Sequence, residues 1–399
     1  MIVPNERRYQ LHSEEANSRI DALLEQLKVP ADTRQYYAQM LTTVLKLYED
    51  GADVGDLKIT NAALKDLRYA FKVFAPYRGT MKVTVFGSAR TGAEDPISVQ
   101  ARAFGRRMVE AGWMVVTGAG DGVMGAAQEG AGRERSFGLN IRLPFEQEAN
   151  PWIADDAKLI NFKYFFIRKL FLLKEADAVA LFPGGFGTFD EAFEVLTLIQ
   201  TGKTHVIPVV LLDAPGGEYW RAWERLLGEQ MVGRGLISQD DESLFRIVDS
   251  VEAGAGEILG FYRNFHSMRF VGEALALRIK RPLPPERLSD LEREFSDILD
   301  GPLEQRRGPL PAEGDELPEF PRLVVPFGRA RFGRLRRLID AINSQRPVVS
   351  VLVVCTGNSA RSQMAEGFLG AYGQGLGDRA ERAPSSRRRR DGREGDRHL

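Results

Sequence analysis

The hydrophobic positions of this chain follow two different periods. Between residues 15 and 77 they recur at helical spacing, as at Ile20 and Leu24, which predicts amphipathic helices. Thr60 has the side chain of a helix N-cap, and the run that follows it is expected to end near Pro76. We interpret this region as an N-terminal helical cap or an arm used in dimerisation.

From Lys82 onward, short apolar runs alternate with longer helical stretches. The expected strands cover residues 82–86, 113–117, 137–143, 158–161, 178–182, 206–212 and 245–248. The expected helices cover residues 97–111, 123–132, 164–176, 192–199 and 219–230, with another from Val251. Such alternation predicts an α/β fold with a doubly wound parallel sheet, in which ligands bind at the carboxyl ends of the strands.

The region beyond residue 280 has a different composition. Residues 280–320 are rich in Pro, Glu and Arg, and one strand is expected at 323–327, followed by a basic amphipathic helix at 332–343. We interpret these elements as a small C-terminal appendage packed on the main domain. From residue 376 the chain is mostly Arg, Gly, Asp and Ser, a composition that predicts disorder. A nucleic-acid-binding tail is the alternative, which the interspersed acidic residues weaken.

The predicted organisation therefore has five parts. They are a helical region (1–79), a Rossmann-like catalytic domain (80–270), the appendage (271–345), a short strand-loop-helix segment (346–375) and an Arg-rich tail (376–399).

Composition restricts the partners and the location. The 399 residues carry a formal net charge of −1, which gives no global reason to expect nucleic acid or an anionic membrane as partner. No apolar run approaches the roughly 20 residues that span a bilayer, and the charged N-terminus lacks a signal-peptide core. Cys355 is the only cysteine and the four histidines are scattered, so we expect a cytoplasmic protein without a zinc site.

The segment Pro183–Glu191 is the most informative stretch of the chain. It joins the apolar strand 178–182 to the helix expected at 192–199. A glycine-rich turn before a helix brings backbone N–H groups and the positive end of the helix dipole to an anion. The expected phosphate-binding residues are Gly184, Gly185, Gly187 and Thr188. Glu191 would hold a carboxylate beside that phosphate, whereas we expect Asp190 to be an acid of the first helical turn.

Two earlier turns carry glycine at the same edge of the expected sheet. The first contains Gly87 and Ser88, and the second contains Gly118 and Gly122. Three such turns in one sheet favour a nucleotide or phosphate site. The second turn also matches a dinucleotide fingerprint formally, but it follows the second strand and no acidic residue closes the next one. A NAD-dependent oxidoreductase is therefore an alternative that we do not favour.

Arg168 and Lys169 lie in a helix that is otherwise strongly apolar. Both cations could simply extend to solvent. For Lys169 this interpretation and a role in substrate binding are equally supported. For Arg168 we favour function, because its helix leads directly into the strand before Pro183–Glu191.

These residues together resemble the LOG family of nucleoside 5′-monophosphate phosphoribohydrolases, whose signature is PGGxGTxxE preceded by an Arg-Lys helix. The resemblance covers roughly residues 60–345 and implies a modified Rossmann fold, a homodimer or higher homo-oligomer, and no cofactor. It implies cleavage of the N-glycosidic bond of a small-molecule nucleotide such as AMP or a cytokinin riboside monophosphate. The matching catalytic positions are Arg168 and Glu191. A binding module of similar fold that does not hydrolyse its ligand is the alternative.

A second motif, Cys355-x5-Arg361-Ser362, follows a predicted strand at 348–354. It resembles the start of low-molecular-weight tyrosine phosphatases and arsenate reductases, in which such a loop binds an oxyanion and activates the thiol. The match covers only about residues 348–372, and neither an Asp-Pro general acid nor further cysteines follow. We therefore interpret Cys355 and Arg361 as a vestigial oxyanion loop without activity.

Overall fold

A computed structural model describes residues 9–141 and 148–344 of the chain. The described residues lie in the first of two units, Met1–Gln345. The predicted loop with Cys355 and Arg361 and the predicted tail from residue 376 lie outside the described residues, as does the end of the strand expected at 137–143. The predicted domain boundaries stay predictions. Within the described ranges, no helix combines the length and the apolar character needed to cross a bilayer.

The larger sheet has seven strands, all parallel, in the order β4-β3-β2-β1-β5-β6-β7. They are β1 (Lys82–Phe86), β2 (Met114–Thr117), β3 (Ser136–Ile141), β4 (Leu159–Phe162), β5 (Ala178–Leu181), β6 (Val209–Leu212) and β7 (Arg246–Val248). The chain starts at β1, moves outward to β4, and then returns to place β5 on the other side of β1. The direction of winding thus reverses between β1 and β5, which is where ligands bind in open α/β sheets.

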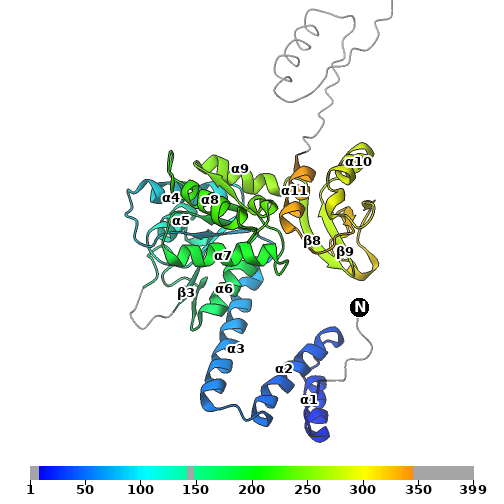
Figure 1. Cartoon of the computed structure of the whole chain (residues 1–399). Helices are drawn as coiled ribbons and strands as arrows, with labels where there is room; N and C mark the ends of the chain where they lie inside the picture. Colours follow the sequence, from blue (N-terminus) through cyan, green and yellow to red (C-terminus); the bar gives the residue numbers. More distant parts are fainter. Residues whose placement is uncertain (1–8, 142–147, 345–399) are drawn as a thin grey trace, which may run out of the picture. The chain divides into compact units, whose positions relative to one another are not determined.

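Helices cover both faces of this sheet (Figure 1). They are α4 (Pro96–Glu110), α5 (Val123–Ala131), α6 (Phe165–Lys174), α7 (Phe186–Gln200), α8 (Tyr219–Leu226) and α9 (Val251–Phe261). Helices α4, α5 and α9 share one apolar cluster with alternate residues of the strands, including Ala178 and Ala180 of β5. Val179 and Leu181 of the same strand belong to the cluster of α6 and α7 on the other face. The predicted doubly wound α/β fold is confirmed.

A second, antiparallel sheet forms the appendage, with the strand order β10-β11-β9-β8. Its elements are β8 (Phe265–Val271), β9 (Ala274–Ile279), α10 (Pro285–Glu294), β10 (Glu304–Arg306), β11 (Arg322–Val325) and α11 (Phe332–Asn343). Of its four strands, only β11 was expected from the sequence, whereas the helix expected at 332–343 is seen as α11 with the same bounds. The sheet begins at Phe265, a few residues before the expected boundary at 270.

The appendage shares its hydrophobic core with the α/β domain. Leu277 and Leu338 belong to the same buried cluster as Val195 and Ile199 of α7. The ring of Phe332 lies so close to Gly202 that a Cβ built there would come within 2.3 Å of it. The two sheets therefore form one continuous packed body along this face.

The N-terminal helices are α1 (Glu14–Gln26), α2 (Ala31–Glu49) and α3 (Val54–Phe74). Helix α3 begins earlier than expected, because the Asp53 carboxylate accepts a hydrogen bond from Asp56 N (2.9 Å) and Asp56 accepts one from Asp53 N (3.2 Å). The expectation that Thr60 is the N-cap is therefore wrong, since this capping box starts the helix upstream. At its other end, Phe74 stacks on Phe171 of α6.

Candidate active site

The candidate site lies at the carboxyl ends of β1 and β5. Backbone N–H of Ser88, after β1, donates a hydrogen bond to Pro183 O after β5 (3.1 Å). A Cβ built on Gly184 would come within 2.8 Å of Ser88 N. Only glycine at position 184 thus allows the two turns to approach this closely, and the approach joins them into one surface.

The turn after β2 closes on the same place. Val123 N donates to Ser88 O (2.9 Å), and Gly122 has φ +61°. A Cβ on Gly122 would lie 2.3 Å from Ser88 O, and one on Gly87 would lie 2.6 Å from the Val123 side chain. The structure therefore brings the three glycine turns together at the reversal point of the sheet.

Helix α7 begins at Phe186, with Gly185 as its N-cap, and not at residue 192 as expected. Gly187 and Thr188 consequently lie in the first turn, which contains no acidic residue. Asp190 is thus not a first-turn acid, and that expectation is wrong. The first N–H groups of a helix have no partner within it and carry partial positive charge, so this end of α7 suits an anion.

Arg168 extends inward from α6. Its Nε donates to Leu139 O at the end of β3 (2.7 Å). Its Nη2 lies 2.2 Å from where a Cβ on Gly118 would stand. Burial lowers the pKa of Arg168, and the negative charge of Glu191 opposes this shift. The guanidinium thus lies beneath the second glycine turn, under the electrostatic influence of Glu191, and does not extend to solvent.

Glu191 holds a buried carboxyl group, with 5% of the residue exposed. Its Oε2 has no hydrogen-bond partner and lies 3.7 Å from Lys169 Nζ. Burial raises the pKa of Glu191 to about 7, although the positive charges of Lys169 and Arg168 act in the opposite direction. A carboxyl group with this pKa can accept or release a proton near neutral pH, which is what a general base requires.

Lys169 is surrounded by carboxylates. Its Nζ lies 2.9 Å from Asp190 Oδ2 and 2.5 Å from Glu194 Oε2, in addition to the longer approach to Glu191. Burial favours a lower pKa of Lys169, but the hydrogen bonds that its ammonium group donates to Glu194 and Asp190 raise this pKa above the ordinary value. Lys169 is therefore a charged group that ties α6 to α7, and its predicted role in substrate binding stays a prediction.

Two further residues shape the glycine turns and were missed by the sequence analysis. The Tyr219 hydroxyl donates to Gly184 O (2.5 Å). Asn150 is buried, and its Nδ2 donates to Gly120 O (2.9 Å), while its own N–H donates to Ala119 O (2.9 Å). No short motif links either residue to the turn that it contacts, so only the tertiary structure reveals them.

The described residues outside this constellation offer no obvious metal centre. Within residues 9–141 and 148–344, His, Cys, Asp and Glu form no group of three or more arranged to hold a metal ion. The groups that the site itself presents are a buried carboxyl group, a guanidinium and backbone donors.

Comparison with known proteins finds similarity in the same region. Residues 123–258 match the family model described as "Possible lysine decarboxylase". The chain is 29% identical over 186 residues to the probable cytokinin riboside 5′-monophosphate phosphoribohydrolase LOG4 of Oryza sativa subsp. japonica, covering 46% of this chain and 76% of the relative. It is 28% identical over 160 residues to the cytokinin riboside 5′-monophosphate phosphoribohydrolase LOG7 of Arabidopsis thaliana, covering 39% and 71%.

Among solved structures, the molybdenum cofactor binding protein of Rippkaea orientalis aligns with a TM-score of 0.31 at 20% identity. The alignment covers 43% of this chain and 91% of that protein.

Proposed function

We propose that this chain, whose α/β domain belongs to the LOG family, hydrolyses the N-glycosidic bond of a nucleoside 5′-monophosphate. The products would be a free base and ribose 5-phosphate. Substrates of the AMP or cytokinin riboside monophosphate type are proposed from the names of the relatives. The observation that carries the proposal is the buried, hydrogen-bond-deficient carboxyl group of Glu191 beside Arg168, next to the glycine turns.

The 5′-phosphate would bind at the start of α7. Backbone N–H groups of Gly185 and Gly187 and the Thr188 hydroxyl supply donors there, and the helix dipole favours the negative charge. The short contact between Ser88 and Pro183 keeps the first and third turns together around this position. The Tyr219 hydroxyl donates a hydrogen bond to the Gly184 carbonyl. Because this peptide is trans, the N–H of Gly185 points away from the Tyr219 ring.

At the sugar, the bond between C1′ and the base nitrogen breaks and its electron pair leaves with the base. A water oxygen forms the new bond to C1′, and ionised Glu191 accepts the proton that this water loses. The same carboxylate stabilises the positive charge that develops on the sugar in the oxocarbenium-like transition state. The base gains its proton from solvent, because Arg168 is permanently charged and suits orientation of the phosphate or base better than proton donation.

The test is direct detection of the released base. The protein is incubated with AMP and a panel of other nucleoside monophosphates, including N6-substituted adenosine monophosphates, and the products are separated by chromatography. We expect Glu191→Ala and Arg168→Ala to abolish release while remaining folded. Glu252→Gln, a change of an exposed carboxylate on α9, is the matched control and should keep full activity.

The same experiment separates the alternatives. A module that binds a nucleotide without hydrolysing it would retain the ligand and release no base, and an oxidoreductase would instead bind a dinucleotide tightly. Near-normal turnover in Glu191→Ala or Arg168→Ala would refute the residue assignment. We also propose that the protein acts in the cytoplasm, forms a homo-oligomer and needs no cofactor for this reaction.

A further inference from the structure

Three carboxylates of α7 lie close to Lys169, and Glu191 is the most distant of them. Lys169 Nζ donates a hydrogen bond to Glu194 Oε2 at 2.5 Å and lies 2.9 Å from Asp190 Oδ2. Its separation from Glu191 Oε2 is 3.7 Å, which is too long for a hydrogen bond. Glu191 Oε2 is buried and has no other hydrogen-bond partner. The ammonium group therefore lies beside Glu191 without being bonded to it.

The spacing of the acids along α7 explains this arrangement. Asp190 and Glu194 are four residues apart, so they lie one turn apart on the same face of the helix and can share one ammonium group. The side chain of Asp190 is 62% exposed and that of Glu194 is 30% exposed, whereas that of Glu191 is 7% exposed. Lys169 is thus bonded to the two more exposed carboxylates and not to the buried one.

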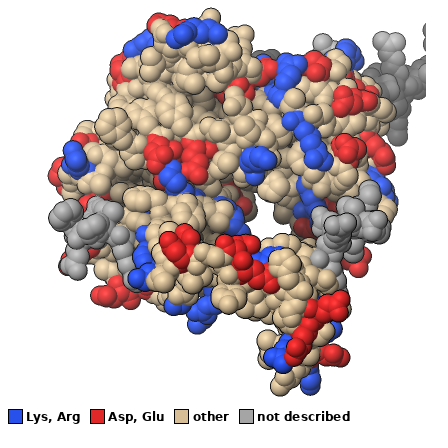
Figure 2. Space-filling view, turned by 60° about the horizontal axis from the view of Figure 1, so that its bottom comes forward, with Lys and Arg blue, Asp and Glu red and all other residues tan. Residues whose placement is uncertain are grey.

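This cluster differs from an ordinary ion pair of the protein surface. Figure 2 shows acidic and basic side chains interspersed over one face of the molecule, and exposed pairs of this kind contribute little to stability. The Lys169 side chain is only 16% exposed, so water and salt screen its charge poorly. A movement of about 1 Å would bring its ammonium group within hydrogen-bonding distance of Glu191, and the bonds to the other two acids oppose that movement.

We propose that Asp190 and Glu194 are positioning residues, which hold Lys169 away from Glu191 and so leave a carboxylate oxygen free to take the proton of the attacking water. This inference rests on the hydrolysis proposed above. An ammonium group bonded to Glu191 would occupy the oxygen that must accept the proton. It would also stabilise the ionised carboxylate and make it a weaker base.

The charged groups that act on Glu191 belong to α6 and α7. Burial raises the pKa of Glu191 to about 7, and the positive charges of Lys169 and Arg168 oppose this rise. The negative charges of Glu194 and Asp190 add to it. Neutralising these two acids should therefore lower the pKa of Glu191 in two ways, because it removes nearby negative charge and releases Lys169 to bond with Glu191.

The pH profile of base release by the full chain tests the proposal. We expect the double variant Asp190→Asn/Glu194→Gln to level off at a rate lower by on the order of tenfold, with a midpoint lower by about 1–3 pH units. Adding Lys169→Met to this double variant should raise the plateau again, since no ammonium group is left to occupy Glu191. A double variant that keeps the parent's midpoint, or a triple variant no more active than the double, would overturn the proposal.

A second measurement does not depend on catalysis. The carbon-13 chemical shift of the Glu191 carboxyl group, assigned by its loss in Glu191→Gln, reports protonation in the free protein. Its midpoint should fall in the double variant and rise in Lys169→Met. Unchanged midpoints would overturn the proposal even if the parent releases base. The expected shifts in a parent that releases no base would refute the hydrolysis and still support the arrangement around Lys169.

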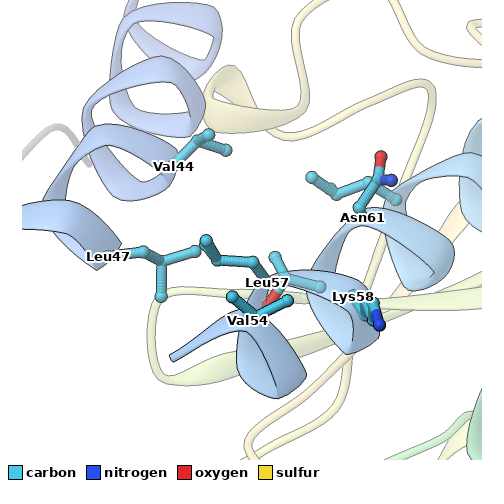
Figure 3. Close-up of a pocket in the computed structure, with 8 residues that line it drawn as sticks. Val44, Leu47, Val54, Leu57, Lys58 and Asn61 are labelled. Carbon is cyan, nitrogen blue, oxygen red and sulfur yellow. The ribbon is translucent and has the colours of Figure 1, made fainter. Parts of the chain in front are cut away.

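Two single variants complete the experiment. Asp190→Asn changes an exposed side chain, so it keeps the test valid if the double variant misfolds, and its midpoint should also fall. Lys58→Met is the matched control for Lys169→Met. Lys58 is on α3, where it lines an open groove of about 390 Å³ with apolar residues such as Val44 and Leu57 (Figure 3). Its replacement should leave the midpoint unchanged, and a rise equal to that in Lys169→Met would overturn the proposal.

Discussion

Glu191 Oε2 lies 3.7 Å from Lys169 Nζ, yet it accepts no hydrogen bond. The Lys169 ammonium group is nearer to Asp190 and Glu194, and these two carboxylates are its main ion-pair partners. Burial of Glu191 raises its pKa to about 7. The positive charge of Lys169 acts in the opposite direction, so the carboxyl group still ionises near neutral pH. This combination determines how the reaction should depend on pH.

We expect kcat/KM for base release to rise with pH and to level off above an apparent pKa of about 7. Ionised Glu191 is the reactive form, so activity below this pH should fall about tenfold for each pH unit. Glu191→Gln should lower the rate by a factor on the order of 100 or more at every pH and remove this limb. The pH profile of initial rates checks both points, and an unchanged limb in the Gln variant would contradict the assignment.

The same pKa shift has a consequence for stability. The folded-state pKa of Glu191 is raised from 4.5 to about 7, so the stability associated with its protonated form is fully present below pH 4.5 and is lost as pH rises through 7. Glu191→Gln should therefore unfold at a higher temperature than the parent at pH 8, with a gain of up to about 3 kcal/mol in the free energy of unfolding. The two proteins should converge at pH 4.5. Thermal denaturation at both pH values measures the difference.

Gly118→Ala should reduce activity much more than stability. The new Cβ would stand 2.2 Å from Arg168 Nη2, the mobile end of a long side chain, which can move at little cost. Moving that guanidinium by about 1 Å should cost on the order of 100-fold in kcat. Kinetics and thermal denaturation are measured together.

Gly122→Ala and Gly256→Ala provide the contrasts for that substitution. Gly122 has φ +61° and its Cβ would meet the Ser88 backbone, so we expect a destabilisation of about 1–3 kcal/mol or more. Gly256 faces open space in the interior of α9, so its replacement should leave activity unchanged and raise stability by about 1 kcal/mol, the difference in helix propensity between glycine and alanine. If Gly118→Ala instead lost stability as Gly122→Ala does, the position of Arg168 would need revision.

Tyr219→Phe should raise the KM for a nucleoside monophosphate without changing kcat. The substitution keeps the ring that stacks on Phe189 and removes only the hydrogen bond to Gly184 O. One neutral hydrogen bond contributes about 0.5–1.5 kcal/mol, which corresponds to an increase of a few-fold to about tenfold in KM. Tyr69→Phe, on α3, is the control. A fall in kcat with unchanged KM would show that Tyr219 does not act through the phosphate-binding turn.

The sequence predicted the parallel sheet because its strands are short apolar runs between glycine turns and helices. Strand β1 has the predicted bounds, Lys82–Phe86. Strand β8 was missed because Phe265–Val271 mixes His, Ser and Arg with apolar residues and shows only partial burial along its length. Such a strand depends on pairing with β9, and this information is not contained in its own pattern.

In the candidate site, too, local patterns were predicted from the sequence and tertiary contacts were not. The glycine turns and the α6 cations are local patterns, so the sequence indicated them. Tyr219 and Asn150 act through hydrogen bonds to backbone atoms of distant segments, and any of several polar side chains could have done so. The start of α7 was misplaced because Phe186 and Gly187 resemble a loop, whereas the helix begins as soon as Gly185 caps it.

The position of β5 beside β1 also determines when the site can exist. Strands β1 to β4 are synthesised before β5. They can pair with one another in the order β4-β3-β2-β1 without it. The turn with Gly87 and Ser88 then has no neighbour on one side until the segment through α7 has emerged. A nascent chain that ends before α7 should therefore hold an ordered half-sheet with no affinity for a nucleotide, and binding should appear in one step once Pro183 reaches Ser88.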